Sequence, residues 1–416
     1  MIMRHLLIPC IFATFLTGCV TETIKTTKIP TLNTVATPAP ESQLLDVAIP
    51  VLDPGLEEEE SDDVLIYPEL RKAEAAYMSL RLAEVLQETG AWAAVRVVPN
   101  SDTITDLTVD GKIVHSDGER LNLKIRVTDS RNQIWLNKNY ETRVSLYAYE
   151  AATRSQYDPF QAVYNNIAND LTSILAALPE KDRTDIRKIT ELTFAQSFSP
   201  DAFGGHLEET SSGSIKMIRL PAENDPMLER VRTVRERDFI YVDTLQDYYS
   251  NFSQDMHEGY QQWRNENLDA TLALREQQRE YRARLIAGGL SVAAGLAAST
   301  SDDRNTRIAG ATAVMGGGYL VKSGLELRNQ AQVHIGRLEE MGLMLDAKIT
   351  PRLIQLEDKT TLLTGTVEEQ YAQWRQILAE IYRAETEIPE IDVGESPLAP
   401  SPPDISGEQL IGPEAQ

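Results

Sequence analysis

The chain has 416 residues, of which 42% are hydrophobic and 25% are charged, with 23 glycines and 20 prolines. This composition is typical of globular proteins and excludes a collagen-like repeat or disorder along the whole chain, while the length favours two or more domains. With 40 Lys and Arg against 63 Asp and Glu, the net charge is −23. A surface this acidic repels phosphate backbones, so we expect no nucleic acid among the partners.

An export signal is predicted over residues 1–18. Arg4 supplies a positive charge, and an apolar run extends from Leu6 to Leu16. The run is too short for a transmembrane helix, which needs about 20 residues, but it has the length of a signal-peptide core. Directly behind it stands Leu16-Thr17-Gly18-Cys19, followed by a polar, Thr-rich segment. An ordinary secretory signal and a buried apolar segment with an incidental cysteine are the alternatives.

The motif Leu16-Thr17-Gly18-Cys19 resembles the lipobox of bacterial lipoproteins. The resemblance implies that the signal is cleaved before Cys19 and that this cysteine is acylated, so that the mature chain has a membrane lipid anchor. Because Val20 is not an Asp, the resemblance also implies sorting to the outer membrane, facing the periplasm. Residues 19–43 then form a lipidated linker. Several acyl chains together anchor a protein firmly, whereas one chain alone is marginal.

An α+β fold is predicted, in which residues 44–198 form a small α/β domain with a mixed sheet. Alternating apolar and polar residues, cleanest from Leu121 to Val127, indicate strands with one buried face. Steps of three and four between apolar residues indicate amphipathic helices. We expect strands at 44–52, 91–99, 106–115, 121–129 and 133–145, and helices at 68–89, 158–178 and 182–198.

This order of elements resembles the small α/β domain of periplasmic lipoproteins of the TolB N-terminal, LpoB and CsgG kind. The likeness is carried by the first strand, Val47–Leu52, and by the helix that ends at Gly90 before the strand Val95–Val98. Asp106–Gly111, at the start of the antiparallel strands, carries it too. The matching segments include no catalytic signature.

A loop or linker is predicted for residues 199–224, and a long antiparallel helical hairpin, similar to a coiled coil, for residues 225–387. Apolar residues follow steps of three and four in two stripes, which is the pattern of helices that pack on each other. The first stripe contains Val242, Leu245, Tyr249, Phe252, Met256, Tyr260 and Trp263, and the second contains Leu338, Leu345, Ile349, Leu356, Leu363, Val367, Tyr371, Trp374, Leu378 and Ile381. Thr350-Pro351 caps a new helix or kinks a continuous one. The Pro-rich, acidic tail 388–416 is disordered by composition.

The tip of the predicted hairpin, residues 285–321, is rich in Gly and Ala. Small residues recur there every four positions, which forms a strip on which two helices can pack closely. The strip consists of Ala287, Ser291 and Gly295 in one segment, with Ala309, Ala313 and Gly317 in the next. Three arrangements fit: the segments pack on each other or on neighbouring subunits, they insert into a membrane as a hairpin, or they act as a hinge. Each of the two segments is shorter than the roughly 20 residues that a helix needs to cross a bilayer.

No catalytic, metal or cofactor site is predicted. Both cysteines, Cys10 and Cys19, precede the folded body, which therefore has no disulfide framework or cysteine-based zinc site. His257-Glu258 begins like the helix of a zinc protease, but Gln261 stands where the second histidine would be. The sequence contains no nucleophile elbow, phosphate loop or dinucleotide fingerprint. We therefore expect a protein that is not an enzyme.

Two functions remain open from the sequence. The first is a non-enzymatic, lipid-anchored scaffold or assembly protein of the outer membrane, whose α/β domain binds an envelope protein and whose hairpin oligomerises or reaches a second partner. The second is a membrane-active subunit of a secretion or pore-like complex that uses the glycine-rich hairpin. In both we expect a homo-oligomer held in the membrane through Cys19, and in neither does the sequence identify the envelope partners.

Overall fold

The computed structural model describes residues 28–37, 39–56, 68–154, 156–298, 352–356 and 359–386. Side chains are described for fewer residues, and those of residues 273–298 are not among them. Several predictions fall outside the described residues: the signal and Cys19, the second half of the tip with Ala309, Ala313 and Gly317, and the tail 388–416.

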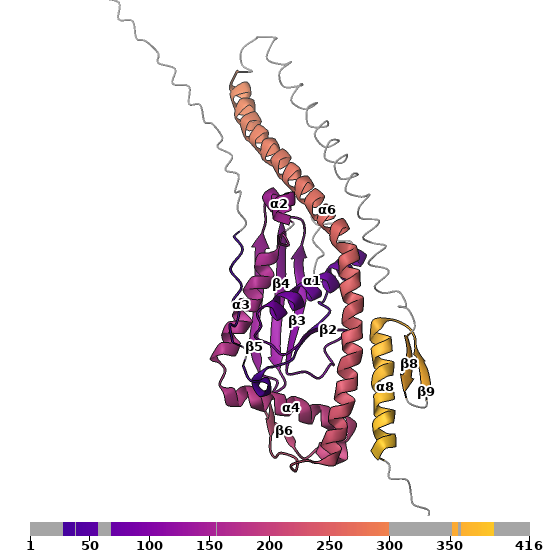
Figure 1. Cartoon of the computed structure of the whole chain (residues 1–416). Coiled ribbons are helices and arrows are strands. Elements are labelled where there is room, and N and C mark those ends of the chain that lie inside the picture. The colour runs from indigo at the N-terminus through magenta and orange to yellow at the C-terminus, as the bar shows by residue number, and fades with distance from the viewer. Residues whose placement is uncertain are drawn as a thin grey trace, which may run out of the picture.

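A five-stranded mixed sheet forms the centre of the body, in the order β2-β1-β3-β4-β5 (Figure 1). Its strands are β1 (Val47–Pro50), β2 (Val95–Val98), β3 (Leu107–Ser116), β4 (Arg120–Asp129) and β5 (Ile134–Arg143). β1 pairs in parallel with β2 and β3, and the β3-β4-β5 part is antiparallel. The predicted α+β class and mixed sheet are confirmed, and each predicted strand of this region is present, with ends that differ from the prediction by at most four residues.

Two helices, α1 (Pro68–Glu88) and α3 (Gln161–Ala177), pack on one face of this sheet. The period of two in β4 explains why: Leu123, Ile125 and Val127 are fully buried beneath the helices, whereas Lys124 and Arg126 between them are exposed on the other face. α1 connects the parallel strands β1 and β2, as a crossover helix does. It begins at the predicted Pro68 and ends next to Gly90, whose φ of +66° favours glycine.

The segment between the sheet and the long helix contains regular structure. The helix α4 (Glu180–Phe198) is followed by the short helix α5 (Pro200–Phe203) and by a hairpin of β6 (Leu207–Glu209) and β7 (Ile215–Met217). Residues 199–224, predicted as a loop or linker, thus contain one helical turn and two short strands. Three further short elements are η1 (Glu41–Gln43), η2 (Leu146–Tyr149) and α2 (Ala151–Arg154).

The helix α6 (Pro226–Ala298) has 73 residues and runs along the β2 edge of the sheet (Figure 1). Gln246 accepts a hydrogen bond of 2.7 Å from the backbone N–H of Val97, and Asp243 pairs with Arg96 at 2.6 Å. Side chains of α6 thus cover an edge strand, which would otherwise present unpaired backbone groups. The helix then continues past the end of the body.

The predicted second arm differs from the structure in its first part. Residues 352–356 and 359–363 form two paired antiparallel strands, β8 (Arg352–Leu356) and β9 (Lys359–Leu363), so the helix expected through Leu356 and Leu363 is wrong. Apolar residues in this stretch fit a helical spacing, but β-branched Ile and Thr are common in it, and these favour strands. The last helix, α8 (Val367–Thr386), lies where helical periodicity predicts one.

α8 packs antiparallel on the first part of α6. Arg375 pairs with Asp238 at 3.1 Å, and Tyr371, one turn earlier in α8, stacks on Tyr241, one turn later in α6. The ring of Trp374 also stacks on that of Tyr241, with centroids 5.1 Å apart. The prediction that the two apolar stripes meet is therefore confirmed for this part of α6.

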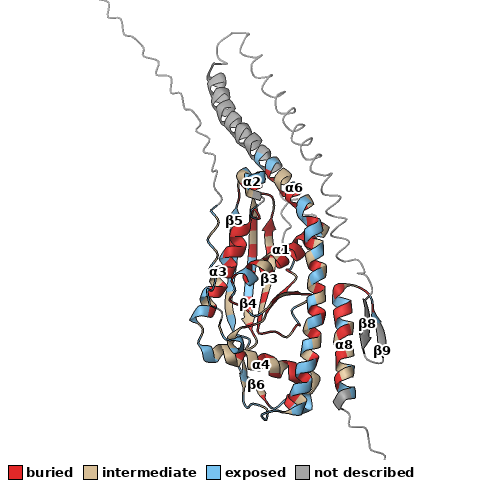
Figure 2. Ribbon diagram, viewed as in Figure 1, coloured by how far each residue is buried: buried red, intermediate tan, exposed pale blue. Residues whose placement is uncertain are grey.

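The later part of the α6 stripe is buried by a different surface than we predicted. Trp263 stacks on Tyr260, and Tyr260 meets Tyr77 of α1 edge to face, with centroids 5.1 Å apart. This part of the stripe packs on the α/β body, not on α8 (Figure 2). Apolar periodicity identifies which residues are buried but not what buries them, because two apolar surfaces were available to one helix.

Candidate functional site

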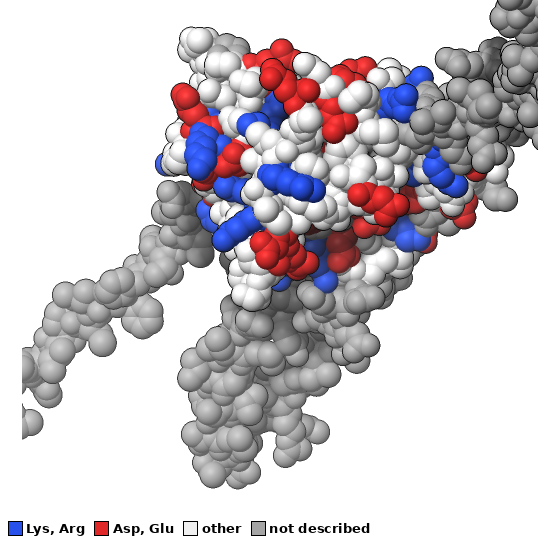
Figure 3. Space-filling view, turned by 90° about the horizontal axis from the view of Figure 1, so that it is seen from below, with Lys and Arg blue, Asp and Glu red and all other residues white. Residues whose placement is uncertain are grey.

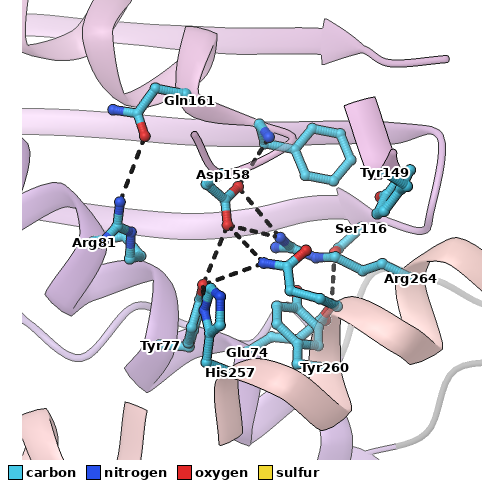
Figure 4. A network of polar contacts seen from close by, with 12 residues as sticks. Glu74, Tyr77, Arg81, Ser116, Tyr149, Asp158, Gln161, His257, Tyr260 and Arg264 are labelled. Carbon is cyan, nitrogen blue, oxygen red and sulfur yellow. Dashed lines mark hydrogen bonds and ion pairs between the residues drawn. The ribbon is translucent and has the colours of Figure 1, made fainter. Parts of the chain in front are cut away.

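A fully buried ion pair joins α6 to the body. Arg264 lies on the buried face of α6, and its Nη1 is 3.2 Å and 3.3 Å from the two carboxylate oxygens of Asp158, in the loop before α3 (Figure 4). The exposed fractions of the two side chains are 0% and 1%. The pair therefore connects two elements that lie about a hundred residues apart in sequence, in a place that water does not reach.

Aromatic rings surround the guanidinium of Arg264. Its central carbon lies 3.8 Å from the ring centroid of Tyr260, 4.9 Å from that of Phe160 and 5.7 Å from that of Tyr77. A cation over an aromatic face is attracted by the ring quadrupole, and more strongly where water is excluded. These rings replace part of the hydration that the guanidinium loses on burial.

The carboxylate of Asp158 accepts hydrogen bonds from three further groups. Tyr77 Oη donates at 3.2 Å, Gln261 Nε2 at 3.1 Å, and the backbone N–H of Phe160 at 2.9 Å. Burial alone would raise the pKa of Asp158, but Arg264, the Phe160 N–H and Gln261 together outweigh burial and lower the pKa. Asp158 is therefore ionised at neutral pH, and its negative charge holds α6 through Arg264.

A second buried carboxylate, Glu74 of α1, continues the network. It accepts hydrogen bonds from Tyr260 Oη at 2.6 Å and from Ser116 Oγ at 2.8 Å, and Arg71 pairs with it at 3.0 Å. Ser116 stands at the end of β3. One turn of α6 is thus bonded directly to α1 and to the loop before α3, and through Glu74 to the end of β3, which fixes its position and rotation on the body.

The network reaches the surface at His257, which is exposed and contacts the buried Tyr77. His257 Nδ1 lies 3.0 Å from Tyr77 Oη. Because the Tyr77 hydroxyl donates its hydrogen to Asp158, we assign a hydrogen to His257 Nδ1, which donates to Tyr77 Oη. Burial lowers the pKa of His257, and Asp158 only partly opposes that effect. Burial raises the pKa of Tyr77 far above its usual value, and Asp158 adds to this. At neutral pH, Tyr77 therefore keeps its proton and His257 stays uncharged.

The turn between β3 and β4 touches the backbone of α6 at the same level. A Cβ on Gly118 would lie 2.0 Å from the carbonyl oxygen of Arg264 and 2.6 Å from the backbone N of Leu268. Tyr149 Oη donates to the carbonyl of Gly118 at 2.7 Å and holds this turn in place. Glycine is therefore required here because two backbones approach closely.

A polar cleft of about 520 Å³ lies elsewhere on the body. Its lining comes from the loop after β2, from β3 and β4, from the β4–β5 turn, from α4 and from β7. Ser101 Oγ donates to Asp110 at 2.7 Å on one wall, and Arg126 stands opposite Asp110 on the neighbouring strand. The hydroxyl of Thr193 is buried at this cleft without a hydrogen-bond partner among the described residues. The cleft thus contains hydrogen-bond donors and acceptors, and both acidic and basic side chains.

The structure places only part of the predicted strip. Ala287, Ser291 and Gly295 lie in α6 with helical backbone, whereas Ala309, Ala313, Gly317 and Cys19 are outside the described residues. Within the described residues, no helix combines the length and the apolar character needed to cross a bilayer. Nor do any three His, Cys, Asp or Glu side chains of that part come together as metal ligands would.

Sequence analysis missed the ion pair, although a signal for one member was present. Arg264 falls four residues after Tyr260 and four before Leu268, so it lies within the apolar stripe rather than beside it. A charged residue in a buried stripe requires a buried partner. The partner could not be identified from the sequence, because Asp158 stands before Pro159 at the start of a predicted helix, where an Asp is an ordinary cap. Gln261, noted only as a missing zinc ligand, is one of its hydrogen-bond donors.

Comparisons with known proteins give no relative: no protein-family model, no curated protein and no solved structure matches this chain.

Proposed function

We propose that this chain is a non-enzymatic, lipid-anchored scaffold of the outer membrane that faces the periplasm. In this proposal Cys19 carries the acyl chains and the α/β body binds an envelope protein. The long helix α6 with its partner arm forms a hairpin with a glycine-rich tip, which extends from the body and assembles copies of the chain.

The observation that supports this proposal is the way α6 is fixed. Its residues up to Leu268 are held by the buried pair Asp158–Arg264, and the same helix then continues to Ala298 beyond the last described contact with the body. At 1.5 Å per residue, the projecting part is about 45 Å long. A helix that is fixed to the body over its first part and projects over its last part can hold a partner at a set distance from the body. This is a scaffold's role and not a catalytic one.

The binding surface of the body is proposed to be the sheet face opposite to α1 and α3. Lys124 and Arg126 are exposed there, and Arg126 also borders the polar cleft. A face with both acidic and basic groups and an unpaired hydroxyl, that of Thr193, suits a polar protein partner better than an apolar one.

Photo-crosslinking in cells tests the scaffold proposal. A photoreactive amino acid at Lys124 or Arg126 is expected to capture a specific envelope protein, identified by mass spectrometry after membrane extraction. The same amino acid at the exposed Asp201 of α5 is the matched control. Equal capture from all three positions, or none from the first two, would count against a binding role for this face.

The membrane-active alternative is tested separately by leakage. Purified full-length protein is added to dye-loaded vesicles of bacterial phospholipids. A pore or conduit subunit releases the dye, whereas a scaffold leaves the vesicles intact even when bound to them. Dye release that stops on replacing Gly295 by Asp would favour the alternative.

A further inference from the structure

The two edges of the central sheet differ in how they are covered. At the β2 edge, α6 lies alongside, and Gln246 accepts a hydrogen bond from the backbone N–H of Val97 (Figure 1). At the β5 edge, no described residue outside the sheet forms a hydrogen bond with the backbone of residues 134–143. Six of the ten residues of β5 are exposed, whereas none of the four of β2 is. β5 thus presents backbone N–H and C=O groups to which another strand can pair.

Basic side chains lie next to this edge, on the sheet face opposite to α1 and α3. Lys124 and Arg126 of β4 are exposed there, two residues apart, and neither forms an ion pair with a described residue. Lys112 of β3 stands directly opposite Lys124, with Asp53 at 3.8 Å from it. Like charges directly opposite each other destabilise a sheet. In a chain of net charge −23, this cluster suits a partner with negative charges.

The acidic side chains nearest to these cations have other partners. Asp110 of β3 stands opposite Arg126, but it accepts a hydrogen bond of 2.7 Å from Ser101. Glu141, the acidic residue of β5, pairs with Arg143 at 3.4 Å. Lys124 and Arg126 are therefore available to carboxylates from another molecule.

The end of the body that contains β6 and β7 has matched charges instead. Basic and acidic side chains lie side by side on it (Figure 3). Lys216 of β7 is exposed and stands directly opposite Glu208 of β6, which is a favourable cross-strand pair. Lys216 is therefore a suitable reference cation for the cluster at Lys124 and Arg126.

A strand added to the β5 edge comes within reach of both cations. Asn137 of β5 stands opposite Arg126 and Asn139 opposite Lys124, so one short amide side chain separates each cation from the edge. The added strand lies two strand spacings from β4, about 9.6 Å. Long Lys and Arg side chains can extend over the amides to meet a Glu of that strand. Residues two apart in a strand point to the same face, so alternate acidic residues face Arg126 and Lys124 in turn.

We propose that the β5 edge binds an extended segment of an envelope protein as a further strand, and that this segment has Glu or Asp at alternate positions. The backbone of β5 supplies hydrogen bonds, and Lys124 and Arg126 recognise the acidic side chains, which is recognition by strand addition. This inference rests on the proposed function, because it gives the chemistry of the protein that the body binds. An anionic membrane fits less well, because it has no backbone groups to pair with β5 and its phosphates would also meet Asp110.

Two fluorescent peptides test the proposal on the full-length protein in detergent. The first is acetyl-Thr-Thr-Glu-Val-Glu-Thr-Thr-amide, and the second is the same peptide with every backbone N–H methylated, which keeps the carboxylates but cannot donate to β5. We expect fluorescence anisotropy to show binding of the first peptide and not of the second. Hydrogen exchange should slow in residues 134–143 when the first peptide binds, and should not change in residues 95–98, which α6 covers.

Three variants isolate the charges. Lys124→Gln and Arg126→Gln should each weaken binding of the first peptide by about two- to fivefold, and the loss should shrink as salt is added. Lys216→Gln is the matched control and should bind the peptide as the wild type does. Equal loss in all three variants would show that the peptide follows the overall charge, and would overturn the inference.

Three further outcomes would also overturn it. One is equal binding of the methylated peptide, which means attraction by charge without strand addition. Another is slow exchange in residues 134–143 that appears without peptide as the protein concentration rises, because a second copy then occupies the edge. The third is binding to phosphatidylglycerol vesicles but to neither peptide. If photo-crosslinking at Lys124 or Arg126 still captures an envelope protein in these cases, the proposed function stands, whereas absence of capture counts against the proposed function itself.

Discussion

Arg264 stands at a position of α6 where both neighbours one turn away, Tyr260 and Leu268, are fully buried. Removing a guanidinium from water costs several kcal/mol unless an anion and hydrogen bonds compensate. Asp158 supplies the anion, and the ring of Tyr260 supplies a polarisable surface. The ion pair thus fixes where α6 lies, because any slip along the helix leaves a buried charge without its partner.

A double-mutant cycle tests this role. Asp158→Asn leaves Arg264 buried without a countercharge and should cost about 3–5 kcal/mol of unfolding free energy, and Arg264→Met should cost a similar amount. The double variant should lose clearly less than the sum of the two, because it removes both charges. Urea denaturation followed by circular dichroism measures all four proteins. Strict additivity would show that the two side chains act independently.

The stability conferred by Asp158 should depend on pH in one direction. Its pKa is lowered in the folded protein, so its ionised form stabilises the fold above the usual Asp pKa of about 3.9, and this stabilisation is lost as the pH falls through the lower, folded pKa. The difference in unfolding free energy between wild type and Asp158→Asn should therefore be largest above about pH 4 and shrink towards pH 2. A difference that grows on acidification would contradict the assignment.

At the level of elements, α6 is shared between two surfaces. Its first part packs against α8 through Tyr241 and Asp238, and its later part packs against α1 through Tyr260. The two contacts are stabilised by different residues, so they can be weakened one at a time.

Two tryptophan variants separate the contacts. Truncation of a buried Trp to Ala costs about 3–5 kcal/mol. Trp374→Ala should release α8, seen as faster tryptic cleavage at Arg375 and Arg383, and leave the α/β body folded. Trp263→Ala should instead lower the stability of the body itself, measured by thermal melting. Equal proteolysis of α8 in both variants would mean that α6 and its two partners unfold as one unit.

Gly118 offers a way to move α6 without changing any side chain of that helix. A Cβ at this position meets the α6 backbone at 2.0 Å, so Gly118→Ala must push the β3–β4 turn and the helix apart, at a cost of about 1–3 kcal/mol. Hydrogen exchange should speed up in α6 around residues 260–268. Gly205→Ala is the control, because its Cβ would meet only the flexible end of Arg219, at 3.0 Å. Unchanged exchange in both variants would show that the turn adapts.

At the scale of the whole molecule, the proposed anchor at Cys19 precedes the described body in sequence, so loss of the anchor should change where the protein is found without changing its fold. Cys19→Ala is expected to abolish incorporation of labelled palmitate and to leave uncleaved precursor or soluble protein after cell fractionation. Palmitate that still enters this variant would refute the lipobox interpretation.

Local sequence determined most of the sheet and its covering helices. Apolar alternation in residues 121–127 fixes one face of β4 as buried, and Pro68 and Gly90 mark the start and end of α1, because these signals act over a few residues. The helical character of α6 and α8 followed from spacing in the same way. The strands β8 and β9 were missed, because their short apolar runs fit both periodicities.

Tertiary structure alone decided which surfaces meet. The sequence marked Tyr260, Trp263 and Trp374 as buried, yet only the fold assigns the first two to the α/β body and the third to the pairing of α6 with α8. It also brings Asp158 to Arg264, across more than a hundred residues of chain. Periodicity reports the side of an element that avoids water, whereas the partner of a buried charge depends on how distant elements pack, which no local pattern contains.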